Sequence, residues 1–118
     1  MEQLECDCNI IHKDVVEKAI KRKPKASEID NLSKLFKTIG DKTRVQILWL
    51  LDNNEMCVCD IANVLNMTKS AISHQLSILK NEKIVKSTKI GKEVFYKLND
   101  EHITALYELG LEHIKHLE

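Results

Sequence analysis

Apolar side chains recur at helical spacing through the first half of the chain. The pattern predicts a short helix over residues 13–23 and a second helix that begins with Ser27 as its N-cap and stops at Gly40. Asp41 is expected to cap a third helix. We expect this third helix to be largely buried, because apolar residues fill too many of its positions for a surface element. These residues are Val45, Ile47, Leu48, Leu50 and Leu51.

Two shorter helices joined by a tight turn are predicted next. Residues 52–54 form a turn, and residues 59–65 form a helix that ends in a second turn at Asn66, a residue type that tolerates the left-handed conformation. Thr68 is expected to cap a further helix that runs through Leu79. This order of elements is the helix-turn-helix arrangement.

After this helix the apolar period shortens from about 3.6 residues toward about 2. Two strands are predicted, the first including Ile84 and Val85, with Gly91 between them, so the segment should form a β-hairpin. Asn99 or Asp100 then caps a long C-terminal helix. The predicted fold is mostly α with a β-hairpin wing, a winged helix-turn-helix.

The remaining residues define the domain organisation. Residues 1–12 have no periodicity and are expected to form a mobile tail. Residues 13–118 are expected to form a single domain, because their number fits one modest core.

The second helix of the helix-turn-helix has one apolar and one polar face. Ile72, Leu76 and Leu79 should face the core. Small polar residues on the other face, with lysines of the hairpin, predict contacts with bases and phosphates of double-stranded DNA. Gln75 in particular could pair with adenine. The alternative is an ordinary amphipathic helix beside a solvated hairpin. The candidate DNA-binding residues are Lys69, Ser70, Ser73, His74, Gln75, Ser77, Lys86, Lys89 and Lys92.

The net charge of the 118-residue chain is zero, with 18 basic and 18 acidic side chains. A neutral total is weak evidence against nucleic-acid binding, but the charges are separated along the chain. Residues 69–97 carry seven lysines and two glutamates, whereas residues 99–118 carry five acidic residues and one lysine. A basic surface is therefore expected beside an acidic helix that bears histidines.

The sequence also restricts the compartment and the partners. No apolar stretch is long enough to cross a membrane, and no signal-peptide segment follows Met1. We therefore expect a cytoplasmic protein with no membrane partner and no small organic substrate. In that compartment the four cysteines should be reduced.

The C-terminal helix carries candidate metal ligands near both ends. His113 and His116 are spaced i, i+3 and can share an ion, whereas His102 lies roughly 16 Å from His113 along a helix axis. Two chains packed antiparallel would bring Asp100 and His102 of one chain to His113 and His116 of the other. The residues thus predict a homodimer with tetrahedral Zn²⁺ sites between antiparallel C-terminal helices. The alternative is that they are ordinary surface histidines.

The cysteines form a second set of candidate ligands. Cys57 and Cys59 open the first helix of the helix-turn-helix, where the helix N-terminus should lower the thiol pKa, and Cys6 and Cys8 lie in the tail. Four thiolates would suit Cd²⁺, Pb²⁺ or Zn²⁺, with His12 as a possible further ligand. The alternative for Cys57 and Cys59 is a buried pair of small apolar side chains.

Three motifs resemble those of the ArsR/SmtB family of metal-sensing repressors. They are GDKTRVQIL at residues 40–48, EMCVCDI at residues 55–61 and SAISHQLSILK at residues 70–80, and the resemblance extends from about Leu32 to the C-terminus. It implies a winged-helix homodimer that represses a metal efflux or detoxification operon. Cys57 and Cys59 match the family's cysteine pair, and the Asp100 and histidine set matches the cross-dimer site of its zinc sensors. Cys6 and Cys8 match the N-terminal ligands of its CadC-like branch.

These observations together lead to one hypothesis and its alternatives. An apo dimer binds a two-fold operator and releases it when Zn²⁺, Cd²⁺ or Pb²⁺ binds. One alternative keeps the fold but makes the cysteines a redox or arsenite switch. Another is a metal buffer or carrier without specific DNA binding. We do not expect an enzyme, because four protein ligands leave no open position on the metal for water.

Overall fold

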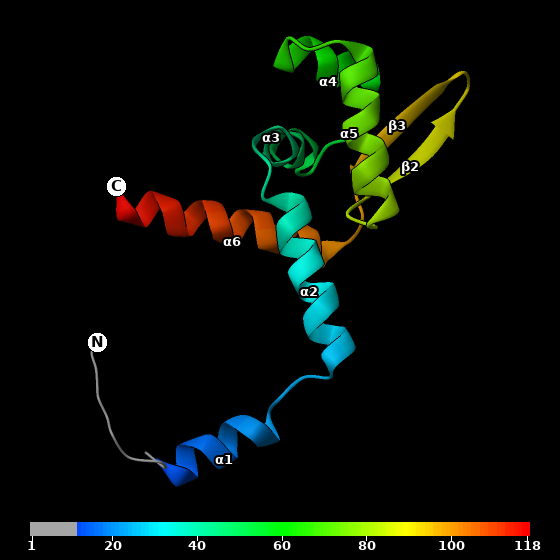
Figure 1. Cartoon of the computed structure of the whole chain (residues 1–118). Coiled ribbons are helices and arrows are strands. Elements are labelled where there is room, and N and C mark those ends of the chain that lie inside the picture. Colours follow the sequence, from blue (N-terminus) through cyan, green and yellow to red (C-terminus); the bar gives the residue numbers. More distant parts are fainter. Residues whose placement is uncertain (1–11) are drawn as a thin grey trace. The chain divides into compact units, whose positions relative to one another are not determined.

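The computed structural model describes residues 12–118. Helices predominate, and the strands form one small sheet (Figure 1), which confirms the predicted fold class. The elements in chain order are α1 (Lys13–Lys21), α2 (Ala26–Ile39), α3 (Lys42–Leu51), β1 (Met56–Cys57), α4 (Val58–Leu65), α5 (Lys69–Asn81), β2 (Val85–Ile90), β3 (Glu93–Leu98) and α6 (Glu101–Leu117).

Contacts divide the chain into two units, residues 1–33 and 34–118. In the first unit α1 has no buried residue, and its apolar side chains Val15, Val16 and Ile20 are exposed. The second unit holds every buried residue of the described chain. The single domain predicted over residues 13–118 therefore stays a prediction.

The helices of the second unit begin where capping side chains satisfy free backbone N–H groups. Asp41 Oδ2 accepts from the N–H of Arg44 at 3.2 Å, and Thr68 Oγ1 accepts from the N–H of Ala71 at 3.0 Å. Asp100 Oδ1 accepts from the N–H of His102 at 2.9 Å. These caps confirm the predicted starts of α3, α5 and α6.

The predicted start of α2 is wrong. Ser27 is not the N-cap, because the helix already includes Ala26. The N–H of Lys25 donates instead to Glu28 Oε1 at 2.8 Å, so the side chain three residues into the helix reaches back to satisfy its start.

Helix α3 lies at the centre of the second unit and contacts α4, α5, α6 and β3 (Figure 1). Its side chains Ile47 and Leu51 are fully buried, as predicted. Val45 and Trp49 are 45% and 49% exposed, so the prediction was wrong for Val45. The helix is therefore covered on most of its circumference but keeps one open apolar strip.

The hairpin forms as predicted, and a third strand joins it. The order is β1-β3-β2, both pairs antiparallel, with Cys57 opposite Phe95 and Val85 opposite Leu98. Gly91 adopts φ +64°, the left-handed conformation that a tight hairpin turn requires. Ile84, predicted to lie in the strand, is a buried residue just before β2. Strand β1 was not predicted, because two residues are too few to show a period.

No helix among residues 12–118 combines the length and the hydropathy of a membrane-spanning segment.

Candidate DNA interface and metal-ligand sites

Helices α4 and α5 form the helix-turn-helix. Asn66 ends α4 in the left-handed conformation at φ +55°, and Thr68 starts α5 two residues later. Helix α5, here called the recognition helix, buries Ile72, Leu76 and Leu79 against the core. The candidate DNA-binding side chains point the other way: Lys69, Ser70, Ser73, His74 and Ser77 are exposed, and Gln75 is half-buried at the margin.

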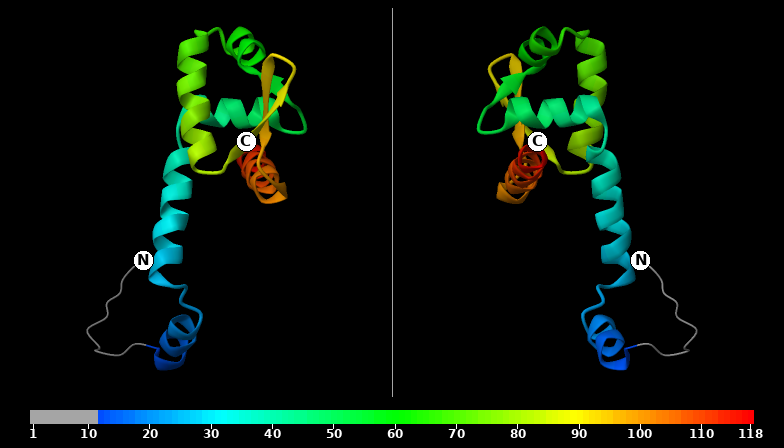
Figure 2. Two further views of the ribbon diagram at one scale, coloured as in Figure 1. Left: turned by 90° about the vertical axis from the view of Figure 1, so that its right-hand side faces the viewer. Right: turned by 90° about the vertical axis from the view of Figure 1, so that its left-hand side faces the viewer.

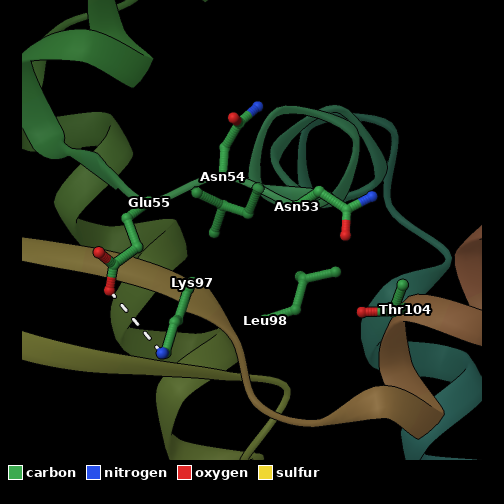
Figure 3. A pocket seen from close by; sticks show the side chains of 7 residues that line it. Asn53, Asn54, Glu55, Lys97, Leu98 and Thr104 are labelled. Atoms are coloured by element: carbon green, nitrogen blue, oxygen red, sulfur yellow. Dashed lines mark ion pairs between the residues drawn. The ribbon is translucent and has the colours of Figure 1, made fainter.

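The hairpin extends beside the recognition helix, and its turn projects away from the helices of the second unit (Figures 1 and 2). Lys86, Lys89 and Lys92 are exposed along it, so they can reach a phosphate backbone. Lys97 differs from them, since its Nζ lies 3.9 Å from Glu55 Oε2 (Figure 3). A half-exposed pair of this kind contributes about 0–1 kcal/mol, but it offsets the charge of Lys97.

The Glu55–Lys97 pair borders a polar pocket of about 440 Å³ at the base of the sheet. Asn53, Asn54 and Thr104 also line it (Figure 3). None of the predicted site residues lines this pocket.

Arg44 is a residue near the candidate DNA interface that the sequence did not point to. It lies in the first turn of α3 and is half-buried. Its Nε donates to Gln75 Oε1 at 2.8 Å, and one terminal guanidinium nitrogen donates to the carbonyl oxygen of Thr38 at 2.9 Å. The available signal was an arginine in the polar first turn of α3, just before the apolar residues of that helix.

Cys57 and Cys59 lie at the start of α4, where Cys57 is the N-cap residue. Both thiols are free; Cys57 is half-buried and Cys59 is exposed. They line a pocket of about 250 Å³ together with Glu93 and Val94 of the hairpin. Two thiols beside one pocket are donors that suit a soft divalent ion, but within residues 12–118 no third ligand lies close enough to complete a site.

The expected lowering of the thiol pKa is wrong for Cys57. The backbone N–H of Asp60 lowers the pKa of Cys57, but burial and the hydrogen bond and charge of the Asp60 carboxylate raise it, and the net change is upward. The same carboxylate accepts from the N–H of Cys57 at 3.3 Å. Burial and an acidic residue in the first turn together outweigh the helix-terminus effect at this position.

Asp100 and His102 lie together at the start of α6. Asp100 Oδ1 caps the helix and lies 3.5 Å from His102 Nδ1, while the His102 side chain is 95% exposed. The N–H of Ile103 lowers the pKa of Asp100 most, and, against the opposing effect of burial, Asn99 and His102 lower it further. The carboxylate is thus ionised, and its second oxygen, Oδ2, is not used in capping the helix.

His113 and His116 lie on the exposed last turns of α6. His113 borders an apolar cavity of about 450 Å³ that Val45 and Leu48 of α3 also line. His116 borders a neighbouring pocket with Asp52 and Glu108. Within residues 12–118 the structure brings together no group of three histidine, cysteine or acidic side chains that could hold an ion.

The remaining predicted ligands of the thiol site belong to the N-terminal tail. Cys6 and Cys8 lie outside the described residues, and His12, the first described residue, is exposed. The described chain thus supplies three pairs of candidate ligands: Cys57 with Cys59 at the start of α4, Asp100 with His102 at the start of α6, and His113 with His116 near the end of α6.

Sequence comparison identifies the family. Residues 41–87, which include the whole helix-turn-helix, match the family described as "Bacterial regulatory protein, arsR family". A cadmium resistance transcriptional regulatory protein CadC homolog from Staphylococcus aureus is 41% identical over 92% of this chain and 89% of its own length. The chain belongs to the arsR family. A transcriptional repressor SmtB homolog from Synechocystis is 30% identical over 93% of this chain and 83% of its own length.

Solved structures support the same assignment for the fold. A homodimeric winged helix-turn-helix DNA-binding domain from Mycobacterium bovis, Mb0332, has a TM-score of 0.73 and 29% identity, over 79% of this chain and 87% of that one. The AntR antimony-specific transcriptional repressor has a TM-score of 0.71 and 26% identity, over 84% of this chain and 92% of that one. This arsR-family chain is therefore a winged helix-turn-helix DNA-binding transcription regulator, and the expectation that it is not an enzyme is confirmed.

Proposed function

We propose that this arsR-family regulator is a metal-responsive repressor. As an apo homodimer it binds a two-fold operator that controls metal efflux or detoxification genes, and it releases this DNA when Zn²⁺, Cd²⁺ or Pb²⁺ binds. The relatives described as cadmium resistance regulators support a metal as the signal.

The observation that carries the proposal is the distribution of candidate ligands along α6. Asp100 and His102 lie at its first turn, and His113 and His116 at its last turns, on a 17-residue helix. Neither pair finds a third ligand within residues 12–118. An antiparallel second copy would supply the missing half of each set, and three imidazole nitrogens with one carboxylate oxygen suit tetrahedral Zn²⁺.

The thiol site is proposed to bind Cd²⁺, Pb²⁺ or Zn²⁺ through Cys57 and Cys59, with Cys6, Cys8 and His12 as further candidate ligands. When bound there, a divalent cation would hold the start of α4 in one geometry. Since α4 packs on the recognition helix, an ion bound at the start of α4 would alter the contact with DNA.

Fluorescence anisotropy tests the proposal. A two-fold duplex is first obtained by selection from a randomised library, and its affinity for the protein is then measured with and without Zn²⁺, Cd²⁺ and Pb²⁺. We expect metal to weaken binding by about five- to 150-fold, the usual range of allosteric coupling. His113→Ala should abolish the response carried by the α6 site and Cys57→Ser that of the thiol site, with Glu112→Gln as a neighbouring control. Unchanged affinity with every metal would refute the proposal.

A second candidate keeps the DNA-binding function but replaces the metal by an oxidant or a trivalent metalloid. The free thiols of Cys57 and Cys59 favour it, as does the similarity to an antimony-specific repressor. Release of the duplex by peroxide or arsenite, but not by Zn²⁺ or Cd²⁺, would identify this alternative.

A further inference from the structure

The hydrogen bonds of Arg44 determine which way the amide of Gln75 faces. A guanidinium group only donates hydrogen bonds, so the Gln75 atom 2.8 Å from Arg44 Nε must be the carbonyl oxygen Oε1. The amide nitrogen Nε2, bonded to the same carbon, is then the atom of the amide that does not contact Arg44 Nε. A free glutamine has no such preference between its two orientations.

Arg44 is itself held in place by a second bond. One of its terminal nitrogens donates to the carbonyl oxygen of Thr38, in the last turn of α2, at 2.9 Å. That carbonyl is one of the helix-end acceptors without a partner inside the helix, and a positive charge there is favourable. The planar guanidinium thus spans two fixed acceptors, one on α2 and one on the recognition helix, which a flexible lysine cannot do as well.

The orientation matters because the DNA bases differ in the major groove. Guanine offers two acceptors, N7 and O6, whereas adenine offers one acceptor, N7, and one donor, N6. A glutamine that recognises adenine uses its amide nitrogen for N7 and its carbonyl oxygen for N6. In Gln75 the carbonyl oxygen already accepts from Arg44, and the two amide hydrogens remain to be donated.

We propose that Arg44 is a specificity-determining positioning residue. It turns Gln75 so that the recognition helix presents two donors, and the pair therefore selects guanine rather than adenine at the base that Gln75 contacts. This replaces the sequence-based expectation that Gln75 could pair with adenine. The inference rests on the specific operator binding in the proposed function, but not on the identity of the metal.

The test is selection of binding sites from a randomised duplex library, done without metal, for the wild-type chain and five variants. Gln75→Leu removes the contact and so reveals which operator position Gln75 recognises. At that position we expect the wild-type chain to prefer guanine over adenine by about ten-fold. Arg44→Ala frees the amide and should shift the same position toward adenine, and Arg44→Lys should restore part of the guanine preference.

Two further measurements separate specificity from stability. Lys42→Ala, which removes an exposed charge two residues away on α3, should leave the base preference unchanged. Gln75→Glu keeps an acceptor for Arg44 but has no donor for a base, so it should fold normally and lose the guanine preference. If Arg44→Ala does not fold, the base preference of Gln75→Glu still tests whether the amide donors of Gln75 select guanine.

Three results would overturn the inference: a wild-type preference for adenine at the Gln75 position, no position that responds to Gln75→Leu, or the same selected base in the wild type and Arg44→Ala. A wild-type chain that selects no consensus at all would instead refute specific operator binding. A consensus that does not respond to metal would refute only the metal-dependent part of the proposed function.

Discussion

Single side chains decide how reactive the thiol site is. The Asp60 carboxylate accepts from the N–H of Cys57 at the start of α4. Burial, and after it the hydrogen bond and charge of the same carboxylate, hold the pKa of the Cys57 thiol above its ordinary value. A divalent ion must therefore displace a proton from Cys57 at neutral pH. Capture of metal by this residue should become easier as the pH rises.

Replacing Asp60 by asparagine should lower the pKa of Cys57, because the amide removes the charge yet can still accept from the Cys57 N–H. The measurement is the rate of alkylation by iodoacetamide at pH 7 in a chain whose other cysteines are serine. We expect the Asp60→Asn variant to react several-fold faster than its parent. Glu55→Gln is the control, a nearby carboxylate that does not affect the Cys57 pKa. Equal rates for Asp60→Asn and the parent would contradict this account.

At the scale of elements, packing of α6 beside the end of α3 brings like charges together. The charge of Asp52, at the C-cap of α3, and its hydrogen bond raise the pKa of Glu108 on α6, with burial adding to the rise. A carboxyl whose folded-state pKa is raised opposes folding once it ionises. Stability is therefore lost as the pH rises from the unfolded-state pKa through the folded-state pKa.

Glu108→Gln should raise the free energy of unfolding at pH 7, because it removes the carboxylate charge that lies beside Asp52. At pH 4, close to the ordinary glutamate pKa of about 4.3, the gain should vanish. Urea unfolding at the two pH values and at one protein concentration measures this difference. Glu112→Gln, one turn further along α6, should show no such pH dependence; a gain for Glu108→Gln that is the same at both pH values would argue against repulsion by Asp52.

The turn of the hairpin depends on one glycine. Gly91 has φ +64°, so an alanine there should cost about 1–2 kcal/mol of folding free energy. Gly110 offers a matched contrast, because it lies within α6 and an added Cβ would meet no atom within 4 Å. We expect Gly91→Ala to destabilise the protein and Gly110→Ala to stabilise it by about 0.4–1 kcal/mol, measured by thermal unfolding. If both substitutions shift the melting temperature in the same direction, the contrasting roles given to Gly91 and Gly110 are contradicted.

At the scale of the whole molecule, α6 leaves apolar surface uncovered. Leu109 and Leu117 are 64% and 71% exposed, and Ile114 is also exposed. Apolar patches on a helix that also carries two pairs of candidate ligands are what a homodimer interface would cover.

Mixing two variants tests whether each α6 site is shared between chains. One chain carries Asp100→Ala with His102→Ala, and the other carries His113→Ala with His116→Ala. Neither homodimer has a complete site, but the mixed dimer has one intact site and one site without ligands. In chains whose four cysteines are also replaced by serine, so that the thiol site is absent, we expect Zn²⁺ binding to reappear on mixing, at one ion per mixed dimer, by titration with a chromophoric chelator. No recovery in a mixture shown to contain mixed dimers would exclude the shared site.

Much of this molecule was accessible from the sequence, because periodicity and caps are local signals. The starts of α3, α5 and α6 followed from Asp41, Thr68 and Asp100, and the hairpin from Gly91. The interactions that escaped prediction join residues distant in sequence. Arg44 meets Gln75 across 31 positions, and Cys57 pairs with Phe95 in the sheet.

The errors arose where two local effects compete. Ser27 is a good capping residue, but the side chain of Glu28 accepts from the backbone N–H of Lys25. The helix therefore begins at Ala26, before Ser27. At Cys57 the helix terminus and the Asp60 carboxylate act in opposite directions on one thiol, and the residue types alone do not say which is stronger. The metal-ligand sets stay predictions, since Cys6 and Cys8 lie outside the described residues and the α6 set requires a second chain.

The two-residue strand β1 connects the thiol site to the wing by pairing with β3. Its two residues are opposite Tyr96 and Phe95, so Cys57 belongs to the same backbone ladder as the wing. Any displacement of Cys57 must break these pairs or carry β3 along with it. The amide protons of β3 are therefore natural reporters of events at a thiol that lies 38 positions earlier in the chain, and their exchange with solvent would record them without any label on the cysteine.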